Sequence, residues 1–396
     1  MAVLSLALVS DALKEWYLEG LRYQLNDKAS IILAQMEKTS EHVEGKEIVM
    51  ALRYGRVGGI GNRADDGTLP TPNARKTKQA KWETKNIFSR FQITDKTIKA
   101  SRSNRGAFAS MLEQEIEDCE VDAKLDLSRQ VLGDGTGVLA TVSSSAYDSK
   151  VTTVTVDTTM YLAEGMLIDI LQAAGTQRHS ECDGAEITAV TSATTFTIAT
   201  GADRSVSDTD IVLVAGNHNL ELTGLDAVIG EDTTLYGINR SLAANKWLNS
   251  NLDNVNGELS ETKIQSAIDD VETKSGSVIN FLLCSKGVKR AYQNLQTSMK
   301  QHVNTLELKG GWKTLSYNGI PLEADKYVKP GRLYCLDLND WKMYQMSDWE
   351  WMAEDGTMLT RVANKPAYEA SLLKYCDIGC QRPRGQARLY GIVEHG

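Results

Sequence analysis

The segment AFASMLEQEIEDCEVDAKLDLSRQVL, Ala107 to Leu132, has the strongest structural pattern in the chain. Its apolar residues recur every three or four positions, which is typical of a helix with one narrow apolar stripe. The stripe consists of Phe108, Leu112, Ile116, Cys119, Ala123, Leu127 and Val131. A helix of this length would span roughly 40 Å, more than the usual globular helix. We expect it to lie along the edge of a sheet, with its charged face available to a partner.

The charges of this helix are complementary to those of the segment before it. Ala107 to Leu132 contains seven acidic and two basic residues, whereas Arg53 to Lys85 contains eight basic and three acidic residues. The stretch GRVGGIGNRADDGTLPTPNARKT, Gly55 to Thr77, has five glycines and two prolines, which predicts a flexible tip. It separates two extended runs, Lys46 to Tyr54 and Lys78 to Ile93. The sequence therefore predicts a long, basic, two-stranded arm.

An isolated hairpin of this kind is marginally stable in water, so we expect the arm to lie on the acidic helix of a neighbouring copy. The alternative is that both are ordinary solvated charged faces. Exposed ion pairs contribute only about 0 to 1 kcal/mol each, so many repeated contacts would hold such an assembly. The predicted arm donors are Arg53, Arg56, Arg75, Lys76 and Lys78, with Trp82 and Phe91 as apolar anchors at the base. The predicted helix acceptors are Glu113, Glu117, Glu120 and Asp126.

Composition narrows the class of protein. With 396 residues, 42% of them apolar, the chain can form two or three folded units. A net charge of −9 argues against a protein that coats itself in nucleic acid, because that mode of binding needs a basic surplus. No apolar stretch is long enough to span a bilayer, and the first residues lack the features of a signal peptide.

The chemical motifs favour no enzyme, cofactor or metal site. The GDGTG segment, Gly133 to Gly137, follows the predicted helix and has no Lys-Ser/Thr after it, so a helix-ending turn explains it better than a phosphate loop. The six cysteines include no CxxC pair, which is typical of free thiols in a reducing compartment. Cys376 and Cys380 lack the further ligands of a metal site. The five histidines are scattered, and no nucleophile motif is present.

The rest of the chain falls into segments of different composition. Residues 138–216 contain 22 Ser and Thr, and five short strand patterns there predict a small all-β barrel or sandwich inserted in the chain. Residues from 217 onward alternate helix and strand signals, which is typical of a layered α/β domain. The predicted organisation is a helical arm over 1–46, a hairpin loop over 47–93, a helix-bearing domain over 94–137, the β insert over 138–216, an α/β domain over 217–370 and a terminal segment over 371–396.

The order of these pieces resembles a tailed-bacteriophage major capsid protein of the Hong Kong 97 type. Four further fragments carry the resemblance in combination, and they are NHNLELTGLDAVIG (217–230), LYGINRS (235–241), SYNGIPLEADKYVKPGRLYCLDL (316–338) and CDIGCQRPRGQARLYGI (376–392). The resemblance implies an α+β fold with an N-terminal arm, an extended loop over a neighbouring subunit, a spine helix in a peripheral domain and an axial domain around 217–370. By the same resemblance, residues 371–396 would return to the peripheral domain.

The function implied is that of a structural subunit of an icosahedral head. Its partners would be further copies of itself in hexamers and pentamers, a separate scaffolding protein, a portal and, optionally, a decoration protein. The shell would assemble in the bacterial cytoplasm and enclose double-stranded DNA without sequence-specific binding or a membrane. Two other interpretations remain open at this point, an encapsulin-like nanocompartment shell and a β-rich surface or tail adhesion protein. A covalent crosslink between Lys76 or Lys78 and Asn364 is also left open.

Overall fold

The computed structural model describes residues 30–41, 43–95, 105–148, 151–173, 182–199, 206–298, 305–308, 312–353 and 358–394. The chain divides into two compact units, one comprising residues 1–125 and 228–396 and the other residues 126–227. The part of the predicted helical arm before Ser30 lies outside the described residues.

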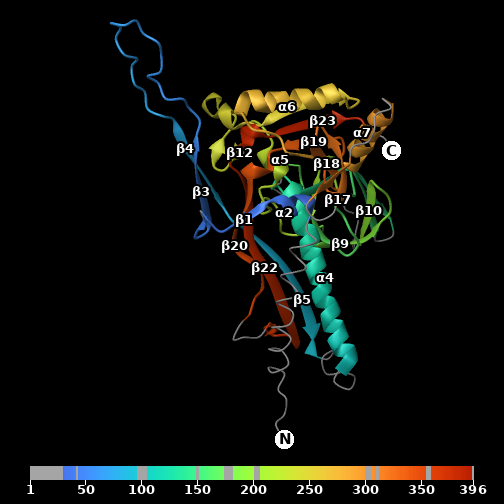
Figure 1. Cartoon of the computed structure of the whole chain (residues 1–396). Helices are drawn as coiled ribbons and strands as arrows, with labels where there is room; N and C mark the ends of the chain where they lie inside the picture. The colour runs from blue at the N-terminus through green and yellow to red at the C-terminus, as the bar shows by residue number, and fades with distance from the viewer. Residues whose placement is uncertain are drawn as a thin grey trace. The chain divides into compact units, whose positions relative to one another are not determined.

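The first unit contains a five-stranded sheet around one long strand (Figure 1). The strands β1, β20, β22 and β21 lie side by side in that order, and β5 also pairs with β22. In β5 every second side chain faces the interior, and Ile87 and Phe91 are buried while Phe88 and Arg90 are exposed. The bounds are Glu37–Thr39 (β1), Lys85–Thr94 (β5), Trp341–Trp351 (β20), Thr360–Arg361 (β21) and Ala367–Cys380 (β22).

The same unit contains a seven-stranded sheet in the order β14-β23-β19-β15-β18-β17-β16. Its central strand β15 is buried along its whole length, which explains the continuous apolar sequence FLLC. Helix α6 contacts the β23 end of this sheet (Figure 1). The bounds are Asn251–Gly257 (β14), Phe281–Cys284 (β15), Thr305–Leu308 (β16), Trp312–Tyr317 (β17), Ile320–Ala324 (β18), Leu333–Leu336 (β19), Ala387–Ile392 (β23), Glu261–Ser275 (α6) and Lys286–Ser298 (α7).

Helix α6 shows how local sequence sets an element's limits. Ser260 lies at its N-cap and accepts a hydrogen bond from the Lys263 backbone N–H. Gly276 ends it in the left-handed conformation at φ 70°, where a residue without a Cβ carries no steric penalty. Both ends agree with the sequence pattern.

A three-stranded sheet in the order β2-β3-β4 forms the arm, with bounds Val43–Glu44, Glu47–Arg53 and Thr77–Glu83. The extended run predicted over 78–93 is in fact two strands. It breaks at Thr84, so β4 pairs with β3 whereas β5 joins the five-stranded sheet. Phe91 therefore packs in that sheet against Trp351, with ring centroids 5.9 Å apart, and not at the hairpin base.

Short elements connect these sheets. They are α2 (Ile31–Gln35), α5 (Leu225–Val228), β12 (Thr234–Leu235), β13 (Ile238–Asn239) and the three short 3-10 helices η1 (Ala243–Leu248), η2 (Leu338–Asp340) and η3 (Pro383–Gly385). The boundaries expected at residues 370 and 371 are wrong. The chain leaves the seven-stranded sheet after β19, runs through the five-stranded sheet from Trp341 to Cys380, and then re-enters the seven-stranded sheet as β23.

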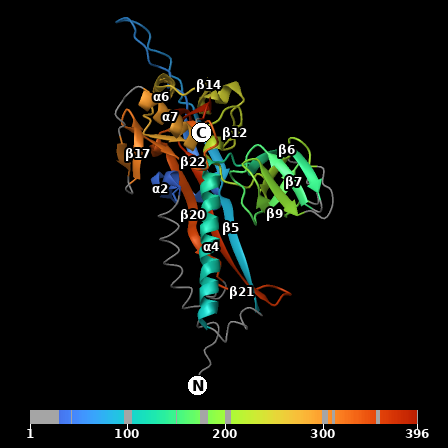
Figure 2. The same ribbon diagram turned by 90° about the vertical axis from the view of Figure 1, so that its right-hand side faces the viewer.

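The second unit is a closed six-stranded barrel in the order β10-β7-β6-β11-β8-β9 (Figure 2). Its bounds are Val138–Asp148 (β6), Val151–Val156 (β7), Leu167–Leu171 (β8), Ala185–Val190 (β9), Thr195–Ala199 (β10) and Ile211–Val214 (β11). Five of these strands match the sequence patterns. The sixth, β6, was missed because its second half, SSSAYD, lacks apolar alternation. The core of the barrel is filled by alternate residues of its strands, including Val154, Phe196 and Ile198.

The long helix α4 runs from Arg105 to Leu132 and confirms the predicted helix. Its described stripe residues Ile116, Cys119, Ala123, Leu127 and Val131 are buried. After the helix, Gly135 and Gly137 both adopt φ 82°, and Asp134 accepts hydrogen bonds from the Thr136 N–H and hydroxyl. The GDGTG segment is thus a turn that leads into β6, as its glycines indicate.

Candidate interaction surfaces

An aromatic cluster fixes the base of the β3-β4 hairpin. Trp82 on β4 lies against Tyr236, with ring centroids 4.1 Å apart, and meets the edge of Tyr344 at 5.7 Å. Gly379 on β22 lies so close that a Cβ there would come within 2.9 Å of the Trp82 ring and 2.4 Å of the Tyr344 ring. Trp82 is 9% exposed. It anchors the hairpin to its own chain, as an apolar base residue should, and is not available to another subunit.

Three further contacts hold the hairpin above this cluster. The Lys81 backbone N–H donates to the Tyr236 carbonyl at 3.0 Å. The Lys78 ammonium donates to the Asn245 side-chain oxygen at 2.8 Å, and its role as an arm donor to a neighbour stays a prediction. Tyr54 stacks on Trp247 at 4.7 Å between ring centroids.

Beyond Tyr54 the hairpin continues as a narrow exposed ribbon, Gly55 to Lys76. The Lys76 carbonyl accepts from the Tyr54 and Gly55 N–H groups, and a Cβ at Gly58 would meet that of Asn73 at 2.6 Å. The two sides of the ribbon therefore touch, and glycine is required where they do. Ile60 is 87% exposed and Leu69 is 82% exposed.

Four of the predicted arm donors are presented to solvent. Arg53, Arg56, Arg75 and Lys76 are exposed. None of the four makes a side-chain hydrogen bond or ion pair with any residue in the described ranges. Their charges are available to a partner.

The predicted acceptors on α4 differ from one another. Glu117 is exposed and has no ion-pair partner among the described residues, whereas the Glu113 side chain lies outside them. Glu120 is 6% exposed, and burial together with the nearby Glu117 charge raises its pKa to about 7. Its interpretation as a solvent-facing acceptor is therefore wrong for this chain. The role of the exposed Glu117 as a helix acceptor stays a prediction.

Asp126 belongs to a buried charge network in the second unit. The Arg129 guanidinium donates to Glu221 at 2.6 and 2.9 Å and to Asp126 at 2.7 and 3.1 Å. These carboxylates raise the pKa of Arg129 above its ordinary value despite burial. Asp126 thus has an ion pair within its own chain, and its role as an intersubunit acceptor stays a prediction. Sequence pattern could not find this network, because Glu221 lies 92 positions from Arg129.

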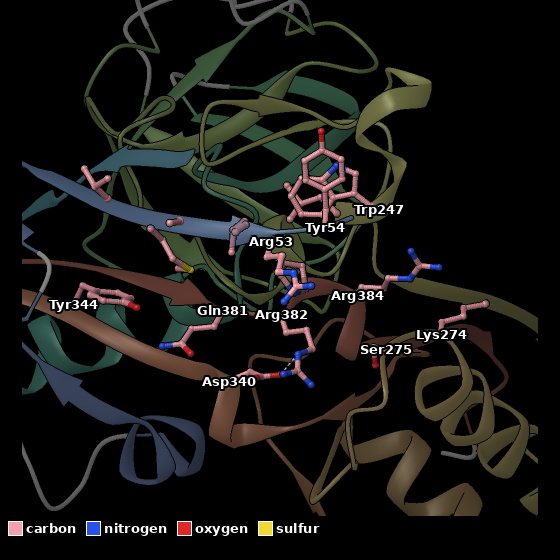
Figure 3. Close-up of a pocket in the computed structure, with 16 residues that line it drawn as sticks. Arg53, Tyr54, Trp247, Lys274, Ser275, Asp340, Tyr344, Gln381, Arg382 and Arg384 are labelled. Carbon is pink, nitrogen blue, oxygen red and sulfur yellow. Dashed lines mark ion pairs between the residues drawn. The ribbon is translucent and has the colours of Figure 1, made fainter. Parts of the chain in front are cut away.

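A groove that the sequence analysis missed lies beside β3 (Figure 3). Its volume is about 800 Å³, and it is lined by β3, by Tyr54 and Trp247, by the end of α6 and by the segment around η3. Four of its lining residues are basic, against one acid, Asp340. The basic residues are Arg53, Lys274, Arg382 and Arg384.

Asp340 lies at the inner end of this groove. Its side chain is 14% exposed and one oxygen is 4.0 Å from the Arg382 Nε atom, the ion pair drawn in Figure 3. Burial raises the pKa of Asp340 to about 6, although Arg382 acts in the opposite direction. Asp340 is thus still mainly ionised at neutral pH, and the groove lining is positive because its four basic residues outnumber this one carboxylate.

Other site types find no support in the described part of the chain. The six cysteines are buried free thiols, and no group of three metal-ligating side chains occurs among the described residues. No described helix is both long and apolar enough to cross a bilayer.

Comparison with solved structures identifies the fold. The structure of the Cyanophage A-1(L) capsid asymmetric unit matches this chain with a TM-score of 0.55 at 14% identity, covering 93% of this chain and 92% of that chain. No family model matches the sequence, and a search of curated proteins gives no match. The chain thus has the fold of a phage capsid chain, a mixed α+β fold that extends over nearly its whole length.

Two other solved structures show a weaker likeness to this chain. A Mycobacterium phage Bobi structure matches with a TM-score of 0.45 at 10% identity over 92% of this chain and 91% of that chain. The holo-SrpI encapsulin complex from Synechococcus elongatus PCC 7942 matches with a TM-score of 0.29 at 15% identity, over 37% of this chain and 55% of that chain.

Proposed function

We propose that this protein is the major capsid protein of a tailed bacteriophage, a structural subunit that self-assembles into the icosahedral head around double-stranded DNA. The observation that carries the proposal is the likeness to a phage capsid chain over 93% of the sequence. The exposed ribbon supports it independently, because an arm with unpaired cations and exposed Ile60 and Leu69 buries little of itself in one chain.

In this proposal the five-stranded sheet and α4 form the peripheral domain, and the seven-stranded sheet with α6 and α7 forms the axial domain of hexamers and pentamers. The barrel over 138–216 is a domain inserted between them. The β3-β4 ribbon lies on a neighbouring copy, where Arg56, Arg75 and Lys76 face Glu117 and other carboxylates of α4. A separate scaffolding protein, a portal and an optional decoration protein complete the assembly in the host cytoplasm.

An encapsulin-like nanocompartment would also be a closed shell of repeated copies, but it would enclose an enzyme and not DNA. A test should therefore measure both closure and content. The full chain is expressed alone and together with its candidate scaffolding protein, and the particles are examined by negative-stain electron microscopy and assayed for nuclease-protected DNA in infected cells. We expect closed shells of uniform size that hold DNA late in infection. A stable monomer under every condition, or shells filled only with an enzyme, would contradict the proposal.

A further inference from the structure

The groove beside β3 has two positive charges that have no counter-charge among the described residues. Lys274 donates to Asp270 at 2.9 Å, and Arg382 donates to Ser277 at 3.1 Å and faces Asp340. Arg53 and Arg384 are exposed and make no side-chain hydrogen bond or ion pair with any described residue. They come from β3 and η3, which are far apart in sequence, and they line the same groove (Figure 3). The groove is suited to an acidic ligand that enters beside Tyr54 and Trp247.

The far end of the hairpin presents such a ligand. The Gly67 N–H donates to the Ala64 carbonyl at 2.9 Å and closes a tight turn. This turn displays Asp65 and Asp66, which are exposed and make no hydrogen bond or ion pair with described residues. The adjacent Arg63 makes no ion pair with either aspartate, and its guanidinium donates to the Asn62 and Thr68 carbonyls.

The turn and the groove of one chain lie at opposite ends of the same ribbon. The ribbon is held closed by the Tyr54 and Lys76 backbone bond and by the close approach of Gly58 to Asn73. From Tyr54 to Asp65 it can extend at most about 40 Å. It can therefore carry its acidic turn to a neighbouring molecule, whereas the groove at its own base lies beside β3.

We propose that the turn carrying Asp65 and Asp66 docks into the β3 groove of the next copy of this chain, against Arg53 and Arg384. The contact is head-to-tail, since the two surfaces differ, and repeated contacts of this type close into rings. This inference rests on the proposed function and adds to it a second arm contact, distinct from the pairing of the ribbon's cations with α4. The groove thus determines where each arm ends.

Charge exchange tests this pairing in the full chain. The turn variant carries Asp65→Lys and Asp66→Lys, the groove variant carries Arg53→Glu and Arg384→Glu, and a third chain carries all four changes. We expect each reversed surface alone to lower the yield of closed shells at least about tenfold, because every repeated contact becomes repulsive. The chain with all four changes restores attraction at each contact and should recover most of that yield, measured by electron microscopy and sedimentation.

A matched control carries Glu164→Lys and Glu186→Lys, two exposed acids outside the hairpin with the same change in net charge as the turn variant. Circular dichroism verifies that each soluble variant keeps the parental helix content. Normal shells from the turn variant or from the groove variant would overturn the inference, and so would failure of the fourfold chain to recover. Loss of DNA retention in the groove variant with normal shell yield would assign the groove to phosphate and also overturn it. If the unsubstituted chain forms no shells, the proposed function itself fails, which is a distinguishable result.

Discussion

At the scale of single residues, Trp82 explains how a charged arm can project from a folded body. Its ring is buried among Tyr236, Tyr344 and the surface above Gly379, so the strands that carry the exposed ribbon begin from an apolar anchor. Charges along the ribbon are then free to serve a partner. We therefore expect residues in the apolar base to affect stability, and residues in the ribbon to affect the proposed assembly.

Replacing Trp82 with Ala should lower the free energy of unfolding by about 3 to 5 kcal/mol, the usual cost of truncating a buried large aromatic side chain. Chemical denaturation of the unassembled chain measures this value. The control is Ile60→Ala in the exposed ribbon, for which we expect a change within about 0.5 kcal/mol. Equal effects of the two substitutions would show that Trp82 is not an anchor.

Glu120 gives a prediction about pH. Its pKa in the folded chain is raised to about 7 from an ordinary value of 4.5, so the folded state binds more protons than the unfolded state between these values. Stability from this group is therefore present at low pH and lost as pH rises toward and through 7. Glu120→Gln should be more stable than the parent by about 3 kcal/mol at pH 8 and by much less at pH 5.

Denaturant unfolding of both proteins at the two pH values measures this difference. Glu164→Gln, at an exposed position, serves as the control and should show no such pH dependence. An equal stability gain for Glu120→Gln at pH 5 and pH 8 would contradict the raised pKa.

At the scale of elements, the barrel has the attributes of an independent folding unit. Its six strands close on themselves and leave no free edge, and it has its own core around Val154, Phe196 and Ile198. The Arg129 network lies entirely within residues 126–227 as well. Without these ion pairs, burial of the Glu221 carboxylate would cost several kcal/mol, because this group would lose its counter-charge.

We therefore expect a fragment of residues 126–227 to fold alone. It should show a β-type circular dichroism spectrum and a cooperative thermal transition. Arg129→Met within this fragment should lower its stability by about 3 to 5 kcal/mol, because Glu221 would remain buried without its partner. A fragment without a cooperative transition would show that the barrel depends on the rest of the chain.

Sequence patterns predicted these elements better than their pairing. The period of α4, five barrel strands and both ends of α6 follow from local residue spacing. The break at Thr84 was not predictable, because the residues on both sides favour extended backbone and only partner strands distinguish β4 from β5. The groove was missed for the same reason, since Arg53, Lys274 and Arg384 meet through tertiary structure. Glu120 looked exposed because charged residues usually are, and the contact of Lys78 with Asn245 was missed because the two residues are 167 positions apart.

At the scale of the whole molecule, assembly should depend on the ribbon's remaining free cations. Reversing Arg75 and Lys76 to Glu should abolish closed shells and leave the helix content of the soluble chain unchanged, because neither side chain contributes to a described internal contact. Electron microscopy and circular dichroism measure the two outcomes.

The matched control reverses Lys286 and Lys365, which are also exposed and lie outside the arm. Raising the salt concentration should weaken parental assembly and have less effect on unfolding, since exposed charges are screened more than buried ones. Normal shells from the Arg75 and Lys76 variant would refute the pairing of the ribbon with α4.

The position of β23 has a consequence for how the protein is made. This late strand, Ala387–Ile392, lies between β14 and β19 in the interior of the seven-stranded sheet. Until the ribosome has released it, the sheet is split into two parts with unsatisfied edges. A polypeptide that ends before β23 would then have an incomplete seven-stranded sheet. We expect such a truncated copy to be excluded from a growing particle, because the surface that the complete sheet forms would be missing.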